Sequence, residues 1–430
     1  MRAAVIGLGV EGKKASKSLL DHGWSVYASD LQKDINLKDL NMPITDINVT
    51  PDNTEQISIV ADNITIDLGA NDINKIKSSD AIVLSPSMWN NKFANEFKLS
   101  GKLLQDVLNK HRKIFTIGVT GTNGKTTSVY IIKAILEAYG KKVLVGGNAG
   151  GGFNGYYDII LEAEKNDYDI ILIEVCDMTL NFCDYCFNFD MLALTNMGND
   201  HMDVHGSMEN YKNSLVKIFK NKKVIVSENQ EYIDEFNKSA NKLIPYKPYK
   251  DDLKLVGKFN KLNAGLATAV AEQVGVPKEI IKNTLKNFEA VEGRLKIIRL
   301  YNSDIYIGKT DNSDAVKTIF DEVYFPVAFL GTPRPNEEHR LDIIDEVVKH
   351  NPEAIIVFPG LANTIDMALD RLSKLHYTGK VDVAHNLDEL IGFVAEYAHD
   401  KPIFIGGNGQ AIIISIQERL EELCKVCNLN

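Results

Sequence analysis

GVTGTNGKTT, residues 118–127, follows an apolar segment at 114–119 and precedes a segment with one apolar helical face at 128–139. This order predicts a strand, a glycine-rich turn and a helix, in which backbone N–H groups and the positive end of the helix hold phosphate groups. Lys125 is placed to neutralise β- and γ-phosphates, and the Thr126 hydroxyl to hold magnesium. Val119 replaces a glycine of the usual P-loop pattern, but the strand–turn–helix order favours a phosphate site over a chance glycine turn.

Length and composition set the class of protein. A chain of 430 residues is long enough for two to three domains, and its 44% hydrophobic and 25% charged residues are typical of a soluble globular protein. The formal net charge of −10 disfavours non-specific binding of nucleic acid, because its phosphates would be repelled. Since no apolar run reaches the length of a membrane span and no signal peptide opens the chain, we expect a cytoplasmic protein without membrane insertion.

Four of the five cysteines form two Cys-x-x-Cys pairs, Cys183/Cys186 and Cys424/Cys427. A shared zinc site is one interpretation of such pairs. The pairs are far apart in the sequence, and disulfides are rare in a reducing cytoplasm. We therefore favour unliganded thiols over the metal site.

The spelling TGTNGKTT at 120–127 resembles the Mur ligase family, which includes the murein peptide ligases, folylpolyglutamate synthase and archaeal relatives. Its members use ATP to convert a carboxylate into an acyl phosphate, which an amine attacks to give an amide, ADP and phosphate. The resemblance implies that ATP is bound by Gly121, Thr122, Asn123, Gly124, Lys125, Thr126 and Thr127.

Residues 1–112 carry a Gly-x-Gly-x-x-Gly pattern after a strand-like segment, and a second strand-like segment ends in Asp30. Together they form a dinucleotide-binding fingerprint, which by itself favours NAD. The MurC and MurD branches of the family instead hold a UDP group on this fold, and Ser85-Pro86-Ser87 resembles their Ser-Pro-Gly near the uracil. The resemblance implies a Rossmann-like UDP-substrate domain with contacts from Gly7, Leu8, Gly9, Val10, Gly12, Asp30, Ser85 and Pro86.

Residues 113–296 are the predicted ATP-binding domain. The turn GGNAG at 146–150 resembles the family's Gly-Asn-x-Gly, which implies that Asn148 faces the reaction centre and the acceptor. An apolar strand at 170–173 ends in Glu174. A carboxylate at the carboxyl end of a strand, beside a phosphate loop, suits magnesium better than it suits a solvated surface position.

The segment DHMDVHGSMENY, residues 200–211, closely resembles a family signature. The resemblance implies that His201 helps to hold a second magnesium ion, whereas Asp203 and His205 either act there or brace the loop. Many members carry a carbamylated lysine about fourteen residues after this histidine, where this chain has Leu215. The departure implies a MurC-like second-metal site, or one formed by His201 and water.

Further ATP contacts are implied by three shorter resemblances. GKFNKLN at 257–263 matches a Gly-x-His-Asn-x-x-Asn pattern, with Phe259 in place of the histidine, and Gly-Arg at 293–294 ends the central domain. Lys309 and Asn312 match a Ser-Lys-Ala-Thr-Asn pattern, but Ile307 stands where the family has an aspartate for the ribose, so Asp311 or Asp314 is the expected substitute. The implied ATP contacts are Asn260, Asn263, Arg294, Lys309 and Asn312.

Residues 297–430 alternate strand-like and helix-like segments, which predicts a second small doubly wound sheet that binds the incoming amino acid. Polar candidates at its strand ends are Arg334, Asn363 and the loop 406–410, without an assigned role. We thus expect a monomer with three α/β domains: an N-terminal Rossmann-like domain, a central P-loop ATPase-like parallel sheet and a C-terminal Rossmann-like domain.

The expected activity is an ATP- and Mg²⁺-dependent, ADP-forming ligase that joins an amino acid to a UDP-linked glutamyl or peptide acceptor. Departures at Leu215, Phe259 and Ile307, with the unfamiliar third domain, favour the archaeal pseudomurein peptide ligases over a bacterial murein enzyme. The alternatives are a Mur-like ligase for a non-UDP carboxylate such as a tetrapyrrole precursor, an ATP-binding regulator without turnover, and an NAD(P)-dependent oxidoreductase. The identities of the acceptor and of the amino acid are left open.

Overall fold

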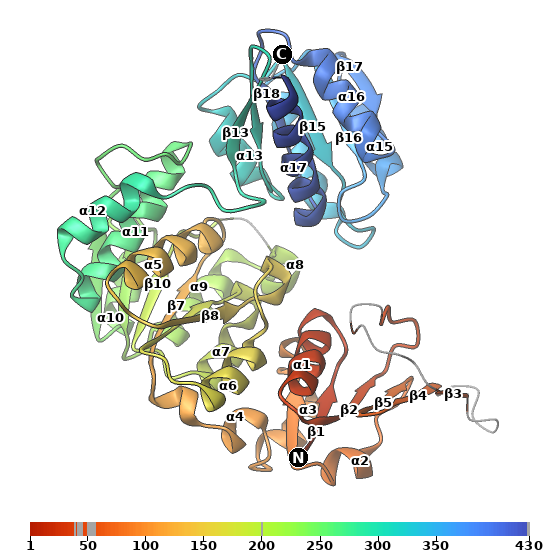
Figure 1. Cartoon of the computed structure of the whole chain (residues 1–430), viewed down its shortest axis with the longest axis vertical. Helices are drawn as coiled ribbons and strands as arrows, with labels where there is room; N and C mark the ends of the chain where they lie inside the picture. The colour runs from red at the N-terminus through yellow and green to blue at the C-terminus, as the bar shows by residue number, and fades with distance from the viewer. Residues whose placement is uncertain (38–39, 41–45, 50–56, 199–200, 428–430) are drawn as a thin grey trace. The chain divides into compact units, whose positions relative to one another are not determined.

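The computed structural model describes the whole chain except residues 38–39, 41–45, 50–56, 199–200 and 428–430. Within the described residues, the strands form three six-stranded sheets that follow one another along the chain (Figure 1). Helices connect most neighbouring parallel strands, so the expected α/β class is confirmed. None of the described helices combines the length and apolar character that a bilayer crossing demands.

The N-terminal sheet has the order β3-β4-β5-β2-β1-β6, of which β5, β2, β1 and β6 are parallel. The two outer strands, β3 and β4, run antiparallel to their neighbours, which strict alternation of strand and helix did not predict. The elements are β1 (Arg2–Ile6), α1 (Val10–Asp21), β2 (Ser25–Asp30), β3 (Asp46–Val49), β4 (Ile57–Ala61), β5 (Ile64–Leu68), α2 (Ile73–Lys77), β6 (Ala81–Leu84), α3 (Lys92–Lys98) and α4 (Leu104–Val107).

The central sheet, β12-β11-β10-β7-β9-β8, is parallel throughout. Its inner strands read as continuous apolar runs, such as the fully buried 170–173, because helices cover both faces of a parallel sheet. The strands are β7 (Phe115–Thr120), β8 (Val143–Gly147), β9 (Ile170–Glu174), β10 (Met191–Leu194), β11 (Lys223–Ser227) and β12 (Lys242–Tyr246). The helices are α5 (Lys125–Ala138), α6 (Tyr156–Lys165), α7 (Leu180–Cys186), α8 (Met202–His205), α9 (Met208–Phe219), α10 (Ile233–Ser239), α11 (Lys258–Val274) and α12 (Lys278–Asn287).

The C-terminal sheet has the order β13-β14-β18-β15-β16-β17, and only β13 is antiparallel to its neighbour. Side chains alternate along its strands between two apolar cores, one under α13–α15 and the other under α16 and α17. The strands are β13 (Lys296–Leu300), β14 (Ser303–Ile307), β15 (Val327–Gly331), β16 (Ala354–Phe358), β17 (Lys380–Val383) and β18 (Ile403–Gly407). The helices are α13 (Ser313–Phe320), α14 (Asp342–Lys349), α15 (Ile365–Lys374), α16 (Leu387–Tyr397) and α17 (Gln410–Cys427).

The chain separates into two compact units. The first unit contains residues 1–197, 201–247 and 265–281, and the second contains 198–200, 248–264 and 282–430. The N-terminal and central sheets therefore belong to one unit, and the predicted boundaries at 112 and 296 stay predictions.

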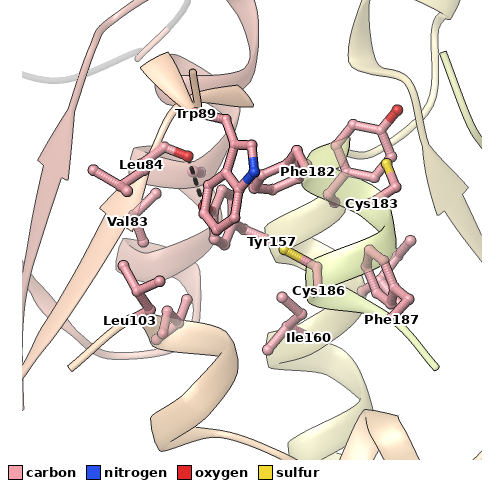
Figure 2. Close-up of a cluster of buried hydrophobic side chains, with 14 of the residues drawn as sticks. Val83, Leu84, Trp89, Leu103, Tyr157, Ile160, Phe182, Cys183, Cys186 and Phe187 are labelled. Carbon is pink, nitrogen blue, oxygen red and sulfur yellow. Dashed lines mark hydrogen bonds between the residues drawn. The ribbon is translucent and has the colours of Figure 1, made fainter. Parts of the chain in front are cut away.

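A single apolar core joins the two sheets of the first unit (Figure 2). The Trp89 ring, which follows β6, meets the edge of Phe182 from α7 at a centroid distance of 5.5 Å. The Tyr157 hydroxyl of α6 donates a hydrogen bond of 2.6 Å to the carbonyl oxygen of Leu84. Because truncating a buried aromatic side chain costs about 3–5 kcal/mol, this core holds the N-terminal sheet firmly against the central one.

Candidate functional site

The glycine-rich turn joins β7 to α5 at the centre of the parallel sheet. Gly121 has φ +126°, and a Cβ atom there would overlap Thr195 and Asn196, so only glycine fits. Asn196, directly after β10, holds the turn: its carbonyl oxygen accepts from Thr122 N at 3.0 Å, and its Oδ1 accepts from Asn123 N at 3.1 Å. Sequence reasoning missed this role of Asn196, although its position after the strand next to β7 is a usable signal.

The turn delivers Lys125 and Thr126 as the first residues of the 14-residue helix α5. Lys125 Nζ donates to the carbonyl oxygens of Gly121 and Thr122 at 2.6 and 2.8 Å, so the ammonium group lies against the turn itself. The first turn of α5 contains no acidic residue, which leaves the positive end of the helix dipole unopposed from within the helix. The arrangement suits a bound phosphate chain.

Glu174 ends β9, the strand between β7 and β8, and its side chain is 1% exposed. Its Oε2 accepts a 2.6 Å hydrogen bond from the Thr126 hydroxyl, and its Oε1 accepts one of 3.1 Å from Asn148 Nδ2. The predicted neighbours Thr126 and Glu174 are thus in contact, and Asn148, expected on the acceptor, touches the same carboxylate. A hydroxyl and a carboxylate oxygen this close are hard donors that fit a magnesium ion.

His205 braces the segment that follows β10. Its Nε2 lies 2.8 Å from Asp177 Oδ2, both side chains are buried, and its ring stacks on Tyr211 at 4.4 Å. Burial raises the pKa of Asp177, but the hydrogen bond from His205 and the charges of Lys125, His201 and His205 outweigh it and lower the pKa to about 2. Asp177 was missed by sequence reasoning, although it follows Glu174 by three residues. The side chain of Asp203 lies outside the described residues.

His201 precedes α8 in a left-handed conformation with φ 52°. It is near enough to Asp177 to contribute to the lowered pKa of that carboxyl group. Leu215, at the position where the resemblance leads one to expect a lysine, is fully buried on α9. Lys212 pairs with Glu209 and Lys217 donates to Asn181, so both nearby lysines have other partners.

The glycine loop after β1 lies beside the carboxyl ends of β2 and β6. Asp30 Oδ2 accepts from Leu8 N at 2.6 Å, so the acid at the end of β2 closes the loop after β1. A Cβ on Gly12 would overlap the carbonyl oxygen of Gly7, and one on Gly7 would lie 3.0 Å from Ser85 Cβ after β6. Gly7, Asp30 and Ser85 therefore gather at one edge of the sheet, as the fingerprint predicts.

The predicted ATP contacts of the second unit have partners of their own. Asn263 Nδ2 donates to Asn260 Oδ1 at 2.9 Å, near the start of α11. Arg294 Nη2 lies 3.4 Å from Gln410 Oε1. Asn312 caps α13 by accepting from Ala315 N at 2.9 Å.

Lys309 belongs to a buried charge cluster. Asp311 Oδ2 lies 3.0 Å from Lys309 Nζ and 2.7 Å from Arg340 Nη1. Burial raises the pKa of Asp311, but the two cations outweigh it and hold this pKa well below its usual range. Arg340 comes from the loop after β15 and was not predicted, because no local pattern marks it.

The carboxyl ends of β15 and β18 form a switch point in the C-terminal sheet. The two strands are neighbours, but the chain leaves β15 toward α14 on one face and β18 toward α17 on the other. Ligands of open α/β sheets bind in the crevice at such a point. Asn408 lies there, fully buried, and its backbone N donates to the Gly331 carbonyl oxygen at 3.0 Å.

The cysteine pairs lie in different units. Cys183 and Cys186 are buried on α7, and burial raises the pKa of both thiols, that of Cys183 to about 12. Cys424 Sγ donates to the Arg299 carbonyl oxygen at 3.0 Å, and the side chain of Cys427 is not described. In the described part of the chain, no three His, Cys, Asp or Glu side chains gather as a metal-binding group.

Comparisons with known proteins find similarity to Mur ligases. The profile of the Mur ligase middle domain matches residues 119–245. The UDP-N-acetylmuramoylalanine–D-glutamate ligase of Alkaliphilus oremlandii is 26% identical over 430 residues, covering 90% of this chain and 88% of that protein. The enzyme of the same name from Lawsonia intracellularis is 26% identical over 290 residues, covering 62% of this chain and 64% of that protein.

A solved structure shares the whole fold. The pseudomurein peptide ligase type C from Methanothermus fervidus superposes with a TM-score of 0.57 over 98% of this chain and 99% of that chain, at 19% identity. At this identity the likeness shows the fold alone.

Proposed function

We propose that the chain is an ATP-dependent, ADP-forming acid–amino-acid ligase of the Mur ligase type, which joins an amino acid to the carboxylate of a UDP-linked acceptor. The observation that carries the proposal is the contact between Thr126 and Glu174 beside Lys125, at the carboxyl ends of adjacent parallel strands. This centre has the groups that phosphoryl transfer to a carboxylate needs: cationic charge, backbone donors and hard oxygen ligands.

On this proposal, the residues of the first unit bind and orient the phosphates of ATP. Backbone N–H groups of 121–127 and the Lys125 ammonium face the β- and γ-phosphates, and Thr126 and Glu174 hold the cation. Magnesium, when bound there, neutralises phosphate charge. His201 is the proposed ligand of a second cation, and Asn260, Asn263, Arg294, Lys309 and Asn312 complete the ATP contacts from the second unit.

The acceptor carboxylate then attacks the γ-phosphorus and ADP leaves. The amine of the amino acid attacks the resulting acyl phosphate, which releases phosphate and a proton as the amide forms. We assign the acceptor to the edge formed by Gly7, Leu8, Gly9, Val10, Gly12, Asp30, Ser85 and Pro86, with domain limits at 1–112, 113–296 and 297–430. The amino acid is assigned to the crevice between β15 and β18. Water must be kept from the acyl phosphate during the reaction.

We further propose a role in pseudomurein peptide synthesis, in the cytoplasm and as a monomer. Relatives named for UDP-linked substrates and a structural neighbour named as a pseudomurein peptide ligase support this role. The proposal includes the first unit's glycine loop as the UDP site.

One observation favours a second candidate, a Mur-like ligase for a carboxylate without UDP. Glu11 stands in the first turn of α1, where a dinucleotide fold holds its pyrophosphate, and Asp30 already accepts the amide hydrogen of Leu8. An anion at this helix end disfavours a diphosphate. Binding of UDP to the purified protein separates the candidates, because only the first requires it.

Phosphate release from ATP and Mg²⁺ tests the proposed function. UDP-linked glutamyl acceptors would be crossed with alanine, lysine and glutamate, with the Lys125→Ala variant as the control. Release that requires one acceptor together with one amino acid is the expected result. Release without any such dependence, or none with any pair, would refute the UDP-dependent ligase.

A further inference from the structure

Glu11 is a buried acid that the proposed chemistry does not use. It lies in the first turn of α1, and its Oε1 accepts a 2.7 Å hydrogen bond from Ala149 N, in the turn after β8. Its Oε2 is buried, and the amide of Tyr156 also acts on this carboxyl group. Burial raises the pKa of Glu11 to about 7, although the amides of Ala149 and Tyr156 and the charge of Lys14 each lower it.

The turn that Glu11 contacts is the turn that contacts Glu174. Asn148, the neighbour of Ala149, donates from its backbone N to the Glu174 carbonyl oxygen at 3.0 Å and from Nδ2 to Glu174 Oε1 at 3.1 Å. A Cβ on Gly151 would overlap the same Oε1. The segment 148–151 therefore lies between two carboxylates, Glu11 on one side and Glu174 on the other.

A glycine that follows this segment, Gly155, leaves space for the Glu11 carboxylate. A Cβ on Gly155 would lie 2.6 Å from Glu11 Oε2, so any larger residue there would displace the carboxylate. Helix α1 is held beside α6 by a second contact, in which Ser18 Oγ donates to Asp158 Oδ1 at 2.5 Å. The position of Glu11 is thus fixed from both sides, independently of any ligand.

We propose that Glu11 is a positioning residue, which anchors the turn 148–151 so that Glu174 is held in place for the cation. The proposal rests on the proposed function of Thr126 and Glu174. Glu11 acts through the Ala149 amide and the Asn148 side chain, and it touches neither the cation nor the nucleotide. The N-terminal glycine loop thereby contributes to metal binding in the central sheet.

The test is the Mg²⁺ concentration that half-saturates nucleotide binding, measured by titration calorimetry at a fixed excess of ADP. Glu11→Ala removes the acceptor of the Ala149 hydrogen bond and raises this concentration about tenfold, the equivalent of about 1.4 kcal/mol. Glu11→Gln keeps an acceptor oxygen in place and changes it less than about twofold. Ser18→Ala, the matched control, breaks the hydrogen bond between α1 and α6 and leaves this Mg²⁺ concentration unchanged.

ADP binding without metal separates positioning from a structural role. The proposal expects that affinity to be the same in wild type, Glu11→Ala and Glu11→Gln. It is overturned if Glu11→Ala binds Mg²⁺ like the wild type, if Ser18→Ala produces the same shift, or if Glu11→Ala weakens metal-free binding equally. Should Glu11→Ala fail to fold, Glu11→Asp replaces it, because its side chain is one methylene too short to reach Ala149 N. A wild type that binds no nucleotide would instead refute the proposed function.

Discussion

Two carboxylates, one in each unit, lie at or after the end of a strand, but they have opposite surroundings. Glu174 in the first unit is contacted by neutral groups, the Thr126 hydroxyl and the Asn148 amide. Asp311 in the second unit is held between two cations, Lys309 and Arg340. Because a buried charge needs compensation, Glu174 suits an added metal ion, whereas Asp311 is already compensated by the chain. The first carboxylate is therefore left for an added cation, whereas the second holds Lys309 and Arg340 in place.

Replacing the two lysines gives the largest expected difference. Lys125→Ala removes the cation of the phosphate turn and lowers the rate of ligation at least about 1000-fold, since it deletes a charge that acts on the transferred group. Lys309→Ala leaves Asp311 paired with Arg340, so its rate falls less than about 100-fold. Steady-state phosphate release on both variants makes the comparison. Equal losses would remove the distinction between the two clusters.

Glu174→Gln tests whether the Glu174 carboxylate binds the metal ion. The amide keeps the size of the side chain but carries no charge, so the Mg²⁺ concentration for half-maximal activity rises by about 100-fold or less. The matched variant Asp311→Asn leaves this concentration unchanged. An unchanged Mg²⁺ dependence in Glu174→Gln would show that the cation is bound elsewhere.

Arg340→Met is expected to act on stability. It removes one of two cations from a buried aspartate, which costs up to about 3 kcal/mol of unfolding free energy, less than a full loss because Lys309 stays. Urea denaturation monitored by circular dichroism measures this cost. The double variant Arg340→Met/Asp311→Asn recovers most of it, and no recovery would mean that Arg340 acts through other contacts.

Acid titration gives a smaller effect in the first unit. The pKa of Asp177 is lowered to about 2 in the folded protein, so its charged form stabilises the fold above its ordinary pKa of 3.8. That contribution, roughly 2 kcal/mol, is lost as the pH falls from about 4 to 2. Asp177→Asn removes it, and its stability therefore converges with that of the wild type in this pH window. Parallel curves for the two proteins down to pH 2 would contradict the assignment.

The sequence predicts the first cluster better than the second for a physical reason. Thr126 and Glu174 each end a local motif, and adjacent parallel strands bring such ends to one edge of a sheet. Arg340 contacts Asp311 from a separate loop, and Glu11 in α1 contacts Ala149 in the turn after β8. Both contacts join residues that are far apart in the sequence, so no local pattern predicts them. Asn148, expected to face the reaction centre and the acceptor, donates to Glu174 from the turn after β8, and its role toward the acceptor stays a prediction.

In the fold, too, local features could be predicted from the sequence and contacts between distant segments could not. The parallel sheets could be predicted because their strands are continuous apolar runs followed by helices. The antiparallel strands β3 and β4 interrupt that alternation in a polar stretch, and the single core shared by two sheets depends on packing such as that of Trp89 on Phe182. Contacts between distant segments depend on how the side chains pack in three dimensions, and the spacing of apolar residues along the sequence does not predict them.

Transfer of ¹⁸O from the acceptor to phosphate tests the central claim most directly. The acceptor found in the phosphate-release experiment would be labelled in the carboxylate that becomes the amide, and the released phosphate analysed by mass spectrometry. An acyl phosphate formed beside Lys125, Thr126 and Glu174 predicts one ¹⁸O atom in each phosphate released. Amide formation with unlabelled phosphate, or with the label in AMP, would contradict the account.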